Sequence, residues 1–169
     1  MKSFRTCIFA LALFVSLSTR VSSLTVLATG LQNIGQITLQ ISGQNTINAA
    51  ATLTSDFFTK SDVSVNGYFT FTIPTDISWT EDTPTTCTEY VQGQSISCAK
   101  QSATEMRITA LSAFSANNFY GFQISGLQNP SSVRSIGGIQ LASFSQDGTA
   151  LDVSIDSTIP ASTFSSGTL

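Results

Sequence analysis

Apolar residues at every second position constrain the fold of this chain more than any other feature. In residues 63–73 the odd positions carry Val, Val, Gly, Phe, Phe and Ile, while Thr70 and Thr72 stand on the opposite face. The same alternation recurs in three further segments, 37–41, 120–124 and 151–155. A period of two buries one face of a strand and leaves the other in water, as in antiparallel sheets. No convincing helical period follows the first 23 residues.

Turn residues separate these runs. Residues 146–149 (Gln-Asp-Gly-Thr) lie between two runs and predict a hairpin, and residues 126–132 read as a loop. Asn66-Gly67 could mark a turn, but it lies inside a run, so we expect a bulge or kink there. Short strands joined by such loops predict an all-β fold, a single antiparallel Ig-like β-sandwich of about seven to nine strands over residues 24–156.

Residues 1–23 have the pattern of a secretory signal peptide. Lys2 and Arg5 precede an apolar stretch at 7–17, and Val21-Ser22-Ser23 supplies small residues for cleavage after Ser23. The apolar stretch is about half of the roughly 20 residues that a membrane span needs. We therefore expect a secreted, extracellular protein, free or associated with the cell surface, without direct membrane insertion.

Charge and composition exclude several classes of function. Only 10% of the residues are charged and 41% are hydrophobic, which is unlike a charged disordered chain. Loss of Lys2, Arg5 and Arg20 with the leader would take the net charge from −3 to −6, which argues against binding nucleic acid. The chain has no His, so Ser-His-Asp, Cys-His and His-ligated metal centres cannot form within it.

Two cysteines remain after the leader. Cys87 and Cys98 are expected to form one disulfide in an oxidising compartment, worth up to about 3 kcal/mol in the chain-entropy model. Two free thiols or intermolecular pairing are the alternatives. Two Cys without His leave a tetrahedral metal short of ligands, so we expect no metal there and no cofactor.

Patterns suggestive of catalysis are weak. Ser97 and Lys100 have Ser-x-x-Lys spacing, but the partner motifs of serine acyltransferases are absent. A glycosidase needs two carboxylates that face each other across a cleft. The candidates are Glu81, Asp82, Glu89 and Glu105, and none forms a clear pair. We expect that the protein is not an enzyme.

Acidic residues near the carboxyl end could help to bind calcium. Asp147, Asp152 and Asp156 do not match the Asp-x-Asp-x-Asp-Gly loop. Asp152 and Asp156 are expected on the solvated face of one strand, about 13 Å apart. No metal site is therefore assigned.

Aromatic residues offer a carbohydrate-binding alternative. Trp79, with Tyr90 or Tyr120, would stack on sugar rings, and Asp, Asn or Gln would bond to sugar hydroxyls. The competing interpretation places Trp79 over the core.

Residues 157–169 form an extension with weak alternation and no partner strand after it. Three outcomes are open. The extension is disordered, adds a strand to its own sheet, or adds a strand to a neighbouring molecule and links subunits.

Residues 63–156 resemble a tandem β-sandwich module of extracellular proteins of ciliates and related protists. The matching features are Phe-Thr-Ile-Pro at 71–74, the two-cysteine loop, Arg-Ile-Thr at 107–109, the segment 120–132 with Asn-Pro-Ser, the Gly-led strand 138–144 and Asp147-Gly148. The resemblance implies a structural or adhesive surface component with no catalytic residues. Such modules usually stand in long, anchored chains, whereas we expect one module and no anchor.

We therefore expect a non-catalytic structural or adhesive subunit that self-assembles into an extracellular coat, matrix or filament. Its partners would be itself or other extracellular proteins, held through sheet edges and the tail. A carbohydrate-binding, lectin-like module with glycan partners is the alternative.

Overall fold

Strands, turns and loops make up every described part of the computed structural model. The structure describes residues 32–33, 38–43, 46–80, 85–154 and 157–159. These ranges contain no helix, and hence none able to cross a membrane. The leader 1–23 and the predicted cleavage after Ser23 lie outside them.

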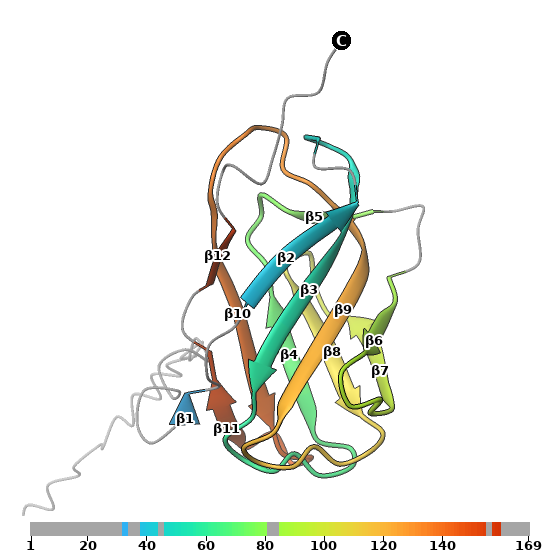
Figure 1. Cartoon of the computed structure of the whole chain (residues 1–169), viewed down its shortest axis with the longest axis vertical. Helices are drawn as coiled ribbons and strands as arrows, with labels where there is room; N and C mark the ends of the chain where they lie inside the picture. The colour runs from blue at the N-terminus through green and yellow to red at the C-terminus, as the bar shows by residue number, and fades with distance from the viewer. Residues whose placement is uncertain (1–31, 34–37, 44–45, 81–84, 155–156, 160–169) are drawn as a thin grey trace, which may run out of the picture.

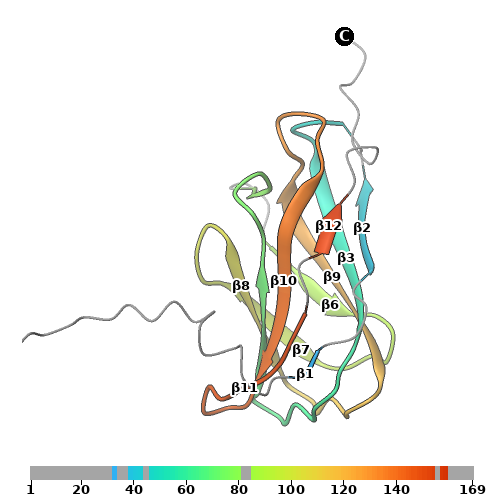
Figure 2. The ribbon, with the colours of Figure 1, turned by 90° about the vertical axis from the view of Figure 1, so that its left-hand side faces the viewer.

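The strands form two sheets packed face to face (Figures 1 and 2). Within the described ranges the back sheet has the order β1-β11-β10-β4-β8-β7, with β12 also paired to β10. The front sheet has the order β2-β3-β9-β5, with β6 also on β9. The strands are β1 (Gln32–Asn33), β2 (Thr38–Gly43), β3 (Ala50–Phe58), β4 (Tyr68–Thr72), β5 (Ser78–Trp79), β6 (Cys87–Glu89), β7 (Ile96–Lys100), β8 (Glu105–Ala110), β9 (Phe119–Gln128), β10 (Ile136–Phe144), β11 (Ala150–Val153) and β12 (Ser157–Ile159).

The predicted all-β sandwich is confirmed. The pairs are antiparallel except for the short parallel pair of β1 with β11. The strands outnumber the seven to nine expected because several of them have only two or three residues, too short to produce a visible alternation.

Aromatic side chains from both sheets fill the core. Phe57 and Phe122 of the front sheet meet Phe69 of the back sheet, with ring centroids 4.8 to 5.7 Å apart. Phe114 and Tyr120 extend this cluster. All five side chains are at most 2% exposed, so the alternation at 63–73 and 120–124 correctly marked Phe69, Tyr120 and Phe122 as buried.

One predicted run is divided by a turn. Residues 63–73 are not one strand with a bulge. The Gly67 amide donates to the Ser64 carbonyl at 2.9 Å, Asn66 has a φ of 67°, and β4 begins at Tyr68. Val63 forms only an isolated bridge with Phe114. The expectation of a bulge failed because both halves of the run keep the same parity across the turn.

The hairpin between β10 and β11 is confirmed. The Ser145 amide donates to the Thr149 carbonyl, and Gly148 takes a φ of 88°, which favours glycine. The exposed Asp147 carboxylate accepts hydrogen bonds from the Ser145 hydroxyl and the Thr149 amide. These bonds lower the pKa of Asp147 to about 2.

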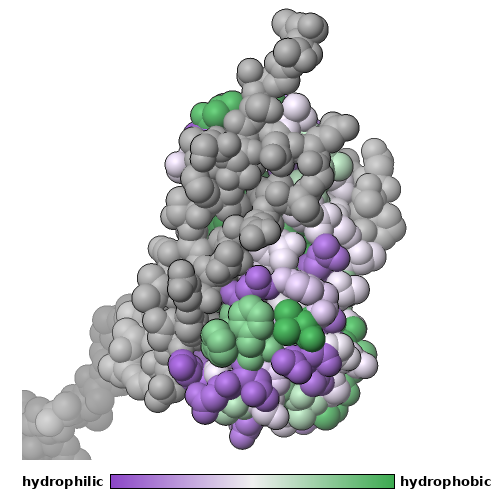
Figure 3. Space-filling model, viewed as in Figure 1, coloured by the Kyte–Doolittle hydropathy of each residue, from purple (hydrophilic) through white to green (hydrophobic). Residues whose placement is uncertain are grey.

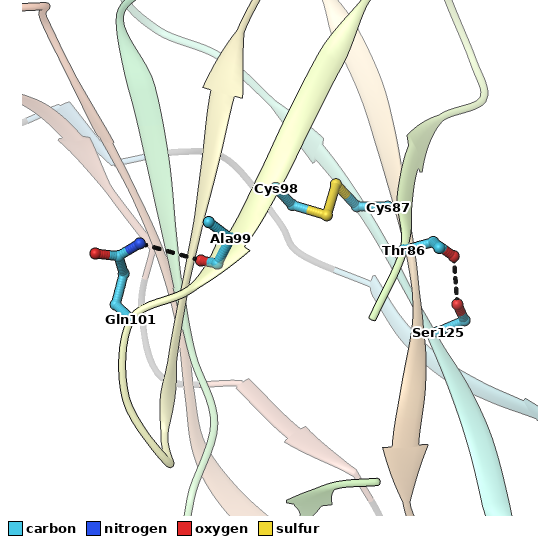
Figure 4. The surroundings of a disulfide bond; sticks show 6 residues. All are labelled: Thr86, Cys87, Cys98, Ala99, Gln101 and Ser125. Carbon is cyan, nitrogen blue, oxygen red and sulfur yellow. Dashed lines mark hydrogen bonds between the residues drawn. A yellow bond between two sulfur atoms is a disulfide. The ribbon is translucent and has the colours of Figure 1, made fainter. Parts of the chain in front are cut away.

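The disulfide joins the two sheets at one side of the sandwich. Cys87 on β6 of the front sheet and Cys98 on β7 of the back sheet are bonded, with Cα atoms 6.1 Å apart (Figure 4). Both side chains are half-buried against the core. The predicted pairing is therefore present, and it links strands that share no backbone ladder.

The extension begins as a strand of its own sheet. Ile159 pairs with Ile136 and Ser157 with Ile139, so β12 lies along the beginning of β10 (Figure 2). Residues 160–169 lie outside the described ranges. The boundaries 24–156 and 157–169 stay predictions.

Candidate binding face

Two phenylalanines stand exposed side by side on the outer face of the front sheet. Phe58 at the end of β3 is directly opposite Phe119 at the start of β9. Their ring centroids are 5.0 Å apart, and the side chains are 44% and 37% exposed. The period of two explains this position, because Phe57 and Tyr120 point inward and their neighbours must point outward.

Tyr90 lies over the same outer face. On the rung two residues further along, Asp56 of β3 faces Gly121 of β9. A Cβ atom on Gly121 would lie 2.6 Å from two ring atoms of Tyr90 and 2.8 Å from a methyl group of Val91. The missing side chain therefore lets the Tyr90 ring pack directly on the sheet and donate its hydroxyl hydrogen bond to Asp56.

Burial and the contact with Asp56 raise the pKa of the Tyr90 phenol. Partial burial of the ring, followed by the hydrogen bond to Asp56 and the nearby negative charges, raises the pKa of Tyr90 to about 12. The phenol is therefore a hydrogen-bond donor throughout the physiological pH range. Even so, the side chain is 47% exposed.

Glu89 fixes the loop that carries Tyr90 and Val91. Its carboxylate is 6% exposed and accepts hydrogen bonds at 2.9 to 3.2 Å. The donors are the main-chain amides of Val91, Gln92, Gln94 and Gly121. Four amides satisfy this buried charge without a cation. Glu89 is therefore structural, which corrects its candidacy as a glycosidase carboxylate.

We call Phe58, Tyr90, Val91 and Phe119 the aromatic face. Figure 3 shows hydrophobic groups surrounded by hydrophilic residues at the end of the front sheet where β3 ends and β9 begins. The residues around them are mostly uncharged: Thr54, Thr88, Gln92, Asn118 and Gln123. The Gln92 side chain donates to the Phe119 carbonyl at 3.3 Å and so ties the loop to β9.

The three predicted sugar-stacking residues are not brought together on the surface. Trp79 is 6% exposed and Tyr120 is 2% exposed, and both belong to the core. The Tyr120 hydroxyl accepts a hydrogen bond from the Ser115 amide at 2.8 Å. A sugar platform made from Trp79 and Tyr120 is therefore wrong, and of the three predicted residues only Tyr90 offers its ring to solvent.

The carboxylates do not form a described catalytic pair. Glu89 is on the front sheet and Glu105 is half-buried on β8 of the back sheet, while Glu81 and Asp82 lie outside the described ranges. Ser97 and Lys100 are exposed on β7, not at a helix start. The Ser-x-x-Lys spacing is therefore not in the structural setting that acyl transfer needs.

Asp152 is buried, contrary to the expectation of a solvated strand face. Its carboxylate accepts hydrogen bonds from the Ser61 hydroxyl and amide and from the Lys60 amide, at 2.8 to 3.1 Å. These bonds tie β11 to the segment that follows β3. Asp147 lies in the hairpin turn, and Asp156 is outside the described ranges. Among the described residues no three acidic or Cys residues form a metal-binding group.

Sequence reasoning missed Phe58, Phe119 and the role of Glu89. A signal was available for the phenylalanines, because each is adjacent to a core aromatic and a strand cannot bury both neighbours on one face. No local signal marked Glu89, because its amide donors include Gly121 on another strand.

Comparisons with known proteins give distant likenesses. No family model matches the chain, and no curated protein matches it. Among solved structures, a cohesin module from a family 33 glycoside hydrolase of Clostridium perfringens ATCC13124 is similar with a TM-score of 0.46 and 10% identity, covering 76% of this chain and 97% of that one.

Two further solved structures are similar over comparable lengths. A non-cellulosomal cohesin from the archaeon Archaeoglobus fulgidus has a TM-score of 0.43 and 10% identity, covering 75% of this chain and 91% of that one. AvmM, described as catalysing macrocyclization in alchivemycin A biosynthesis, has a TM-score of 0.34 and 7% identity, covering 78% of this chain and 95% of that one.

Proposed function

We propose that the protein is a non-catalytic binding module that holds another protein through its aromatic face. The observation that carries the proposal is the exposed Phe58–Phe119 pair next to Tyr90, which Asp56 and Gly121 hold flat on the same sheet. Aromatic side chains fixed before binding lose little conformational entropy when a partner covers them.

The surroundings of the aromatic face indicate the chemistry of the partner. Apart from the Asp56 carboxylate, which accepts the hydrogen bond of the Tyr90 hydroxyl, the rim is made of amide and hydroxyl side chains. Protein interfaces combine an aromatic centre with such a polar rim. The partner would therefore present an apolar centre with an uncharged polar edge. Because few charges face it, we expect affinity to change little with salt concentration.

We further propose that this binding takes place outside the cell, in a coat, matrix or other surface assembly. The leader pattern at 1–23 supports secretion, and the disulfide between Cys87 and Cys98 suits an oxidising compartment. The resemblance to protist surface modules supports a structural or adhesive role.

Paired substitutions test the binding face. Phe58→Ala with Phe119→Ala removes the exposed rings, whereas Leu111→Ala with Val133→Ala removes equally exposed apolar side chains elsewhere, at 51% and 47% exposure. The wild type and the Phe variant are each immobilised and exposed to proteins from the surface and medium of the producing cells. Proteins that bind the wild type and do not bind the Phe variant are purified. Their affinities for all three forms are then measured by calorimetry.

The proposal expects at least about a tenfold loss of affinity for the Phe variant and almost none for the control, since a hot-spot aromatic typically contributes more than about 1.4 kcal/mol. If no retained protein depends on Phe58 and Phe119, or if the Leu111 and Val133 changes weaken binding equally, the aromatic face is not the binding site.

Glycan binding is the second candidate, and Tyr90 is the observation that favours it. Its ring packs on Gly121 while the side chain stays 47% exposed beside Thr88 and Gln123. A ring fixed in this way suits stacking on a sugar. Glycan-array signal that is lost in Tyr90→Ala and kept in Tyr90→Phe would support this function. A blank array for the wild type would exclude it for the glycans displayed.

A further inference from the structure

The free edge of the back sheet at β7 is a second surface with binding capacity. Among the strands that the structure describes, β7 pairs with β8 alone, and its other side is the end of that sheet. Among the described residues, β6 is joined to β7 by the disulfide but by no hydrogen bond. An edge strand of five regular residues is a template for pairing with another strand.

Hydrogen bonds beside the strand show which of its residues bond to β8. The Leu111 amide donates to the Ser95 carbonyl, and the Gln101 amide donates to the Glu105 carbonyl, both at 2.9 Å. The pairs Ser95–Leu111 and Gln101–Glu105 continue the register of β7 with β8 by one residue at each end. In an antiparallel ladder only alternate residues exchange bonds with the neighbour, so the odd-numbered residues of β7 face β8.

The even-numbered residues of β7 therefore direct their main-chain groups away from the sheet. These are Ile96, Cys98 and Lys100. Their amide and carbonyl groups are spaced to pair with an antiparallel strand that has the same pattern. The β7 edge of a second copy presents the same alternating amide and carbonyl groups.

We propose that two copies of this chain associate by antiparallel pairing of their β7 strands, with Cys98 directly opposite Cys98 of the second copy. In this register Ile96 of each copy faces Lys100 of the other. Each of the three pairs exchanges two backbone hydrogen bonds. The back sheets then form one continuous sheet across a two-fold axis, and this use of β7 goes beyond the function proposed for the aromatic face.

Side-chain size fits the close positions of this pairing. Ser97 of one copy faces Ala99 of the other as a non-hydrogen-bonded pair, in which Cα atoms are only about 4.5 Å apart. Both side chains are small and exposed, so they meet without steric conflict. A foreign strand would have to supply equally small residues at the same two positions, whereas a second copy supplies them automatically.

The charge of Lys100 does not oppose the pairing. Its counterpart in the second copy lies four residues along the strand pair, about 14 Å away. That distance exceeds the Debye length of about 10 Å at 0.1 M salt, so repulsion between the exposed amines is screened. The apolar stem of Lys100 can lie along Ile96 of the second copy while the amine stays in water.

A proline at an outward-facing position tests the pairing without breaking β8. Lys100→Pro removes an amide that does not bond to β8 and places a ring in the path of a second strand. Lys100→Ala is the matched control, because it removes the charge and keeps the amide. Ala99→Arg adds bulk at the close position, and Ser131→Arg adds the same charge at an exposed loop position.

Sedimentation equilibrium of the secreted chain across a concentration series measures the association, and circular dichroism checks that each variant is folded. The wild type, Lys100→Ala and Ser131→Arg are expected to reach twice the monomer mass. Lys100→Pro and Ala99→Arg are expected to raise the dimer dissociation constant by at least about tenfold. A wild type that stays monomeric, or folded blocking variants that still dimerise, would overturn the proposal.

Cysteine exchange tests the register and does not depend on the blocking variants. A Ser97→Cys chain mixed with an Ala99→Cys chain should form a covalent dimer on mild oxidation, because the new thiols lie opposite each other. Each variant alone should cross-link much more slowly. Equal cross-linking in all three samples would contradict the register. Phe58→Ala with Phe119→Ala should leave the dimer unchanged, which separates this inference from the aromatic face.

Discussion

At the scale of single residues, Gly121 and Asp56 determine how Tyr90 is displayed. Gly121 leaves the space in which the ring packs, and Asp56 accepts the hydrogen bond that orients it. A tyrosine on a loop would otherwise sample several rotamers, at a cost on binding of about 0.5 to 1.5 kcal/mol for each immobilised side chain. The two residues therefore prepare the aromatic face for a partner.

Replacing Asp56 should change the titration of Tyr90. Asp56→Asn removes the negative charge that disfavours phenolate, so the pKa of Tyr90 should fall from about 12 while remaining above 10.0, because burial still raises it. Absorbance of phenolate at about pH 11, with Tyr90→Phe as the blank, measures the change. An unchanged titration would show that Asp56 does not hold the phenol.

The same shift predicts the direction of a stability change at alkaline pH. The unfolded chain releases the Tyr90 proton near pH 10, whereas the folded chain keeps it until about pH 12. The stabilisation is therefore complete below pH 10 and is lost as the pH rises towards 12. The wild type should lose more stability than Tyr90→Phe across this window, as measured by urea unfolding.

At the scale of elements, Glu89 connects β6, β9 and the loop 90–94. Where β6 ends, the Glu89 carboxylate accepts hydrogen bonds from the Gln92 amide of the loop and from the Gly121 amide of β9. The disulfide joins β6 to β7 of the other sheet. β6 is therefore attached both to the loop that carries part of the aromatic face, through Glu89, and to the β7 edge, through the disulfide.

Removing the charge of Glu89 should destabilise this region. In Glu89→Gln one acceptor oxygen becomes a donor group that faces amide donors, so the free energy of unfolding should fall by about 1–3 kcal/mol. Urea unfolding measures the change, and hydrogen exchange should quicken at Gln92 and Gln94. Glu105→Gln, at a half-buried position on β8, is the control with an expected change within about 0.5 kcal/mol. Equal effects of the two substitutions would contradict the proposed role of Glu89.

At the scale of the whole molecule, the sandwich divides its aromatic residues between the core and the surface. Phe57, Phe69 and Phe122 hold the sheets together, whereas Phe58 and Phe119 remain on the outer face. The first set determines stability, and we propose that the second set determines binding.

This division predicts a large difference between two similar substitutions. Phe69→Ala leaves a cavity between the sheets and should lower the free energy of unfolding by about 3–5 kcal/mol. Phe58→Ala removes an exposed ring and should cost about 1 kcal/mol or less. Chemical denaturation of both variants measures the difference. Comparable losses would mean that Phe58 belongs to the core.

The sequence determined the sheet class, the β10–β11 hairpin and most of the buried face, because these follow from the two-residue period and from turn chemistry acting over a few neighbours. It also identified the pairing of Cys87 with Cys98, since the alternatives were few. Only the tertiary structure decided that Trp79 and Asp152 are buried, that Glu89 is satisfied by amides and that Tyr90 lies on Gly121. The burial of these side chains and the contacts of Glu89 and Tyr90 depend on strands that are far apart in the chain. The residue pattern of one strand does not specify which other strand will pack against it.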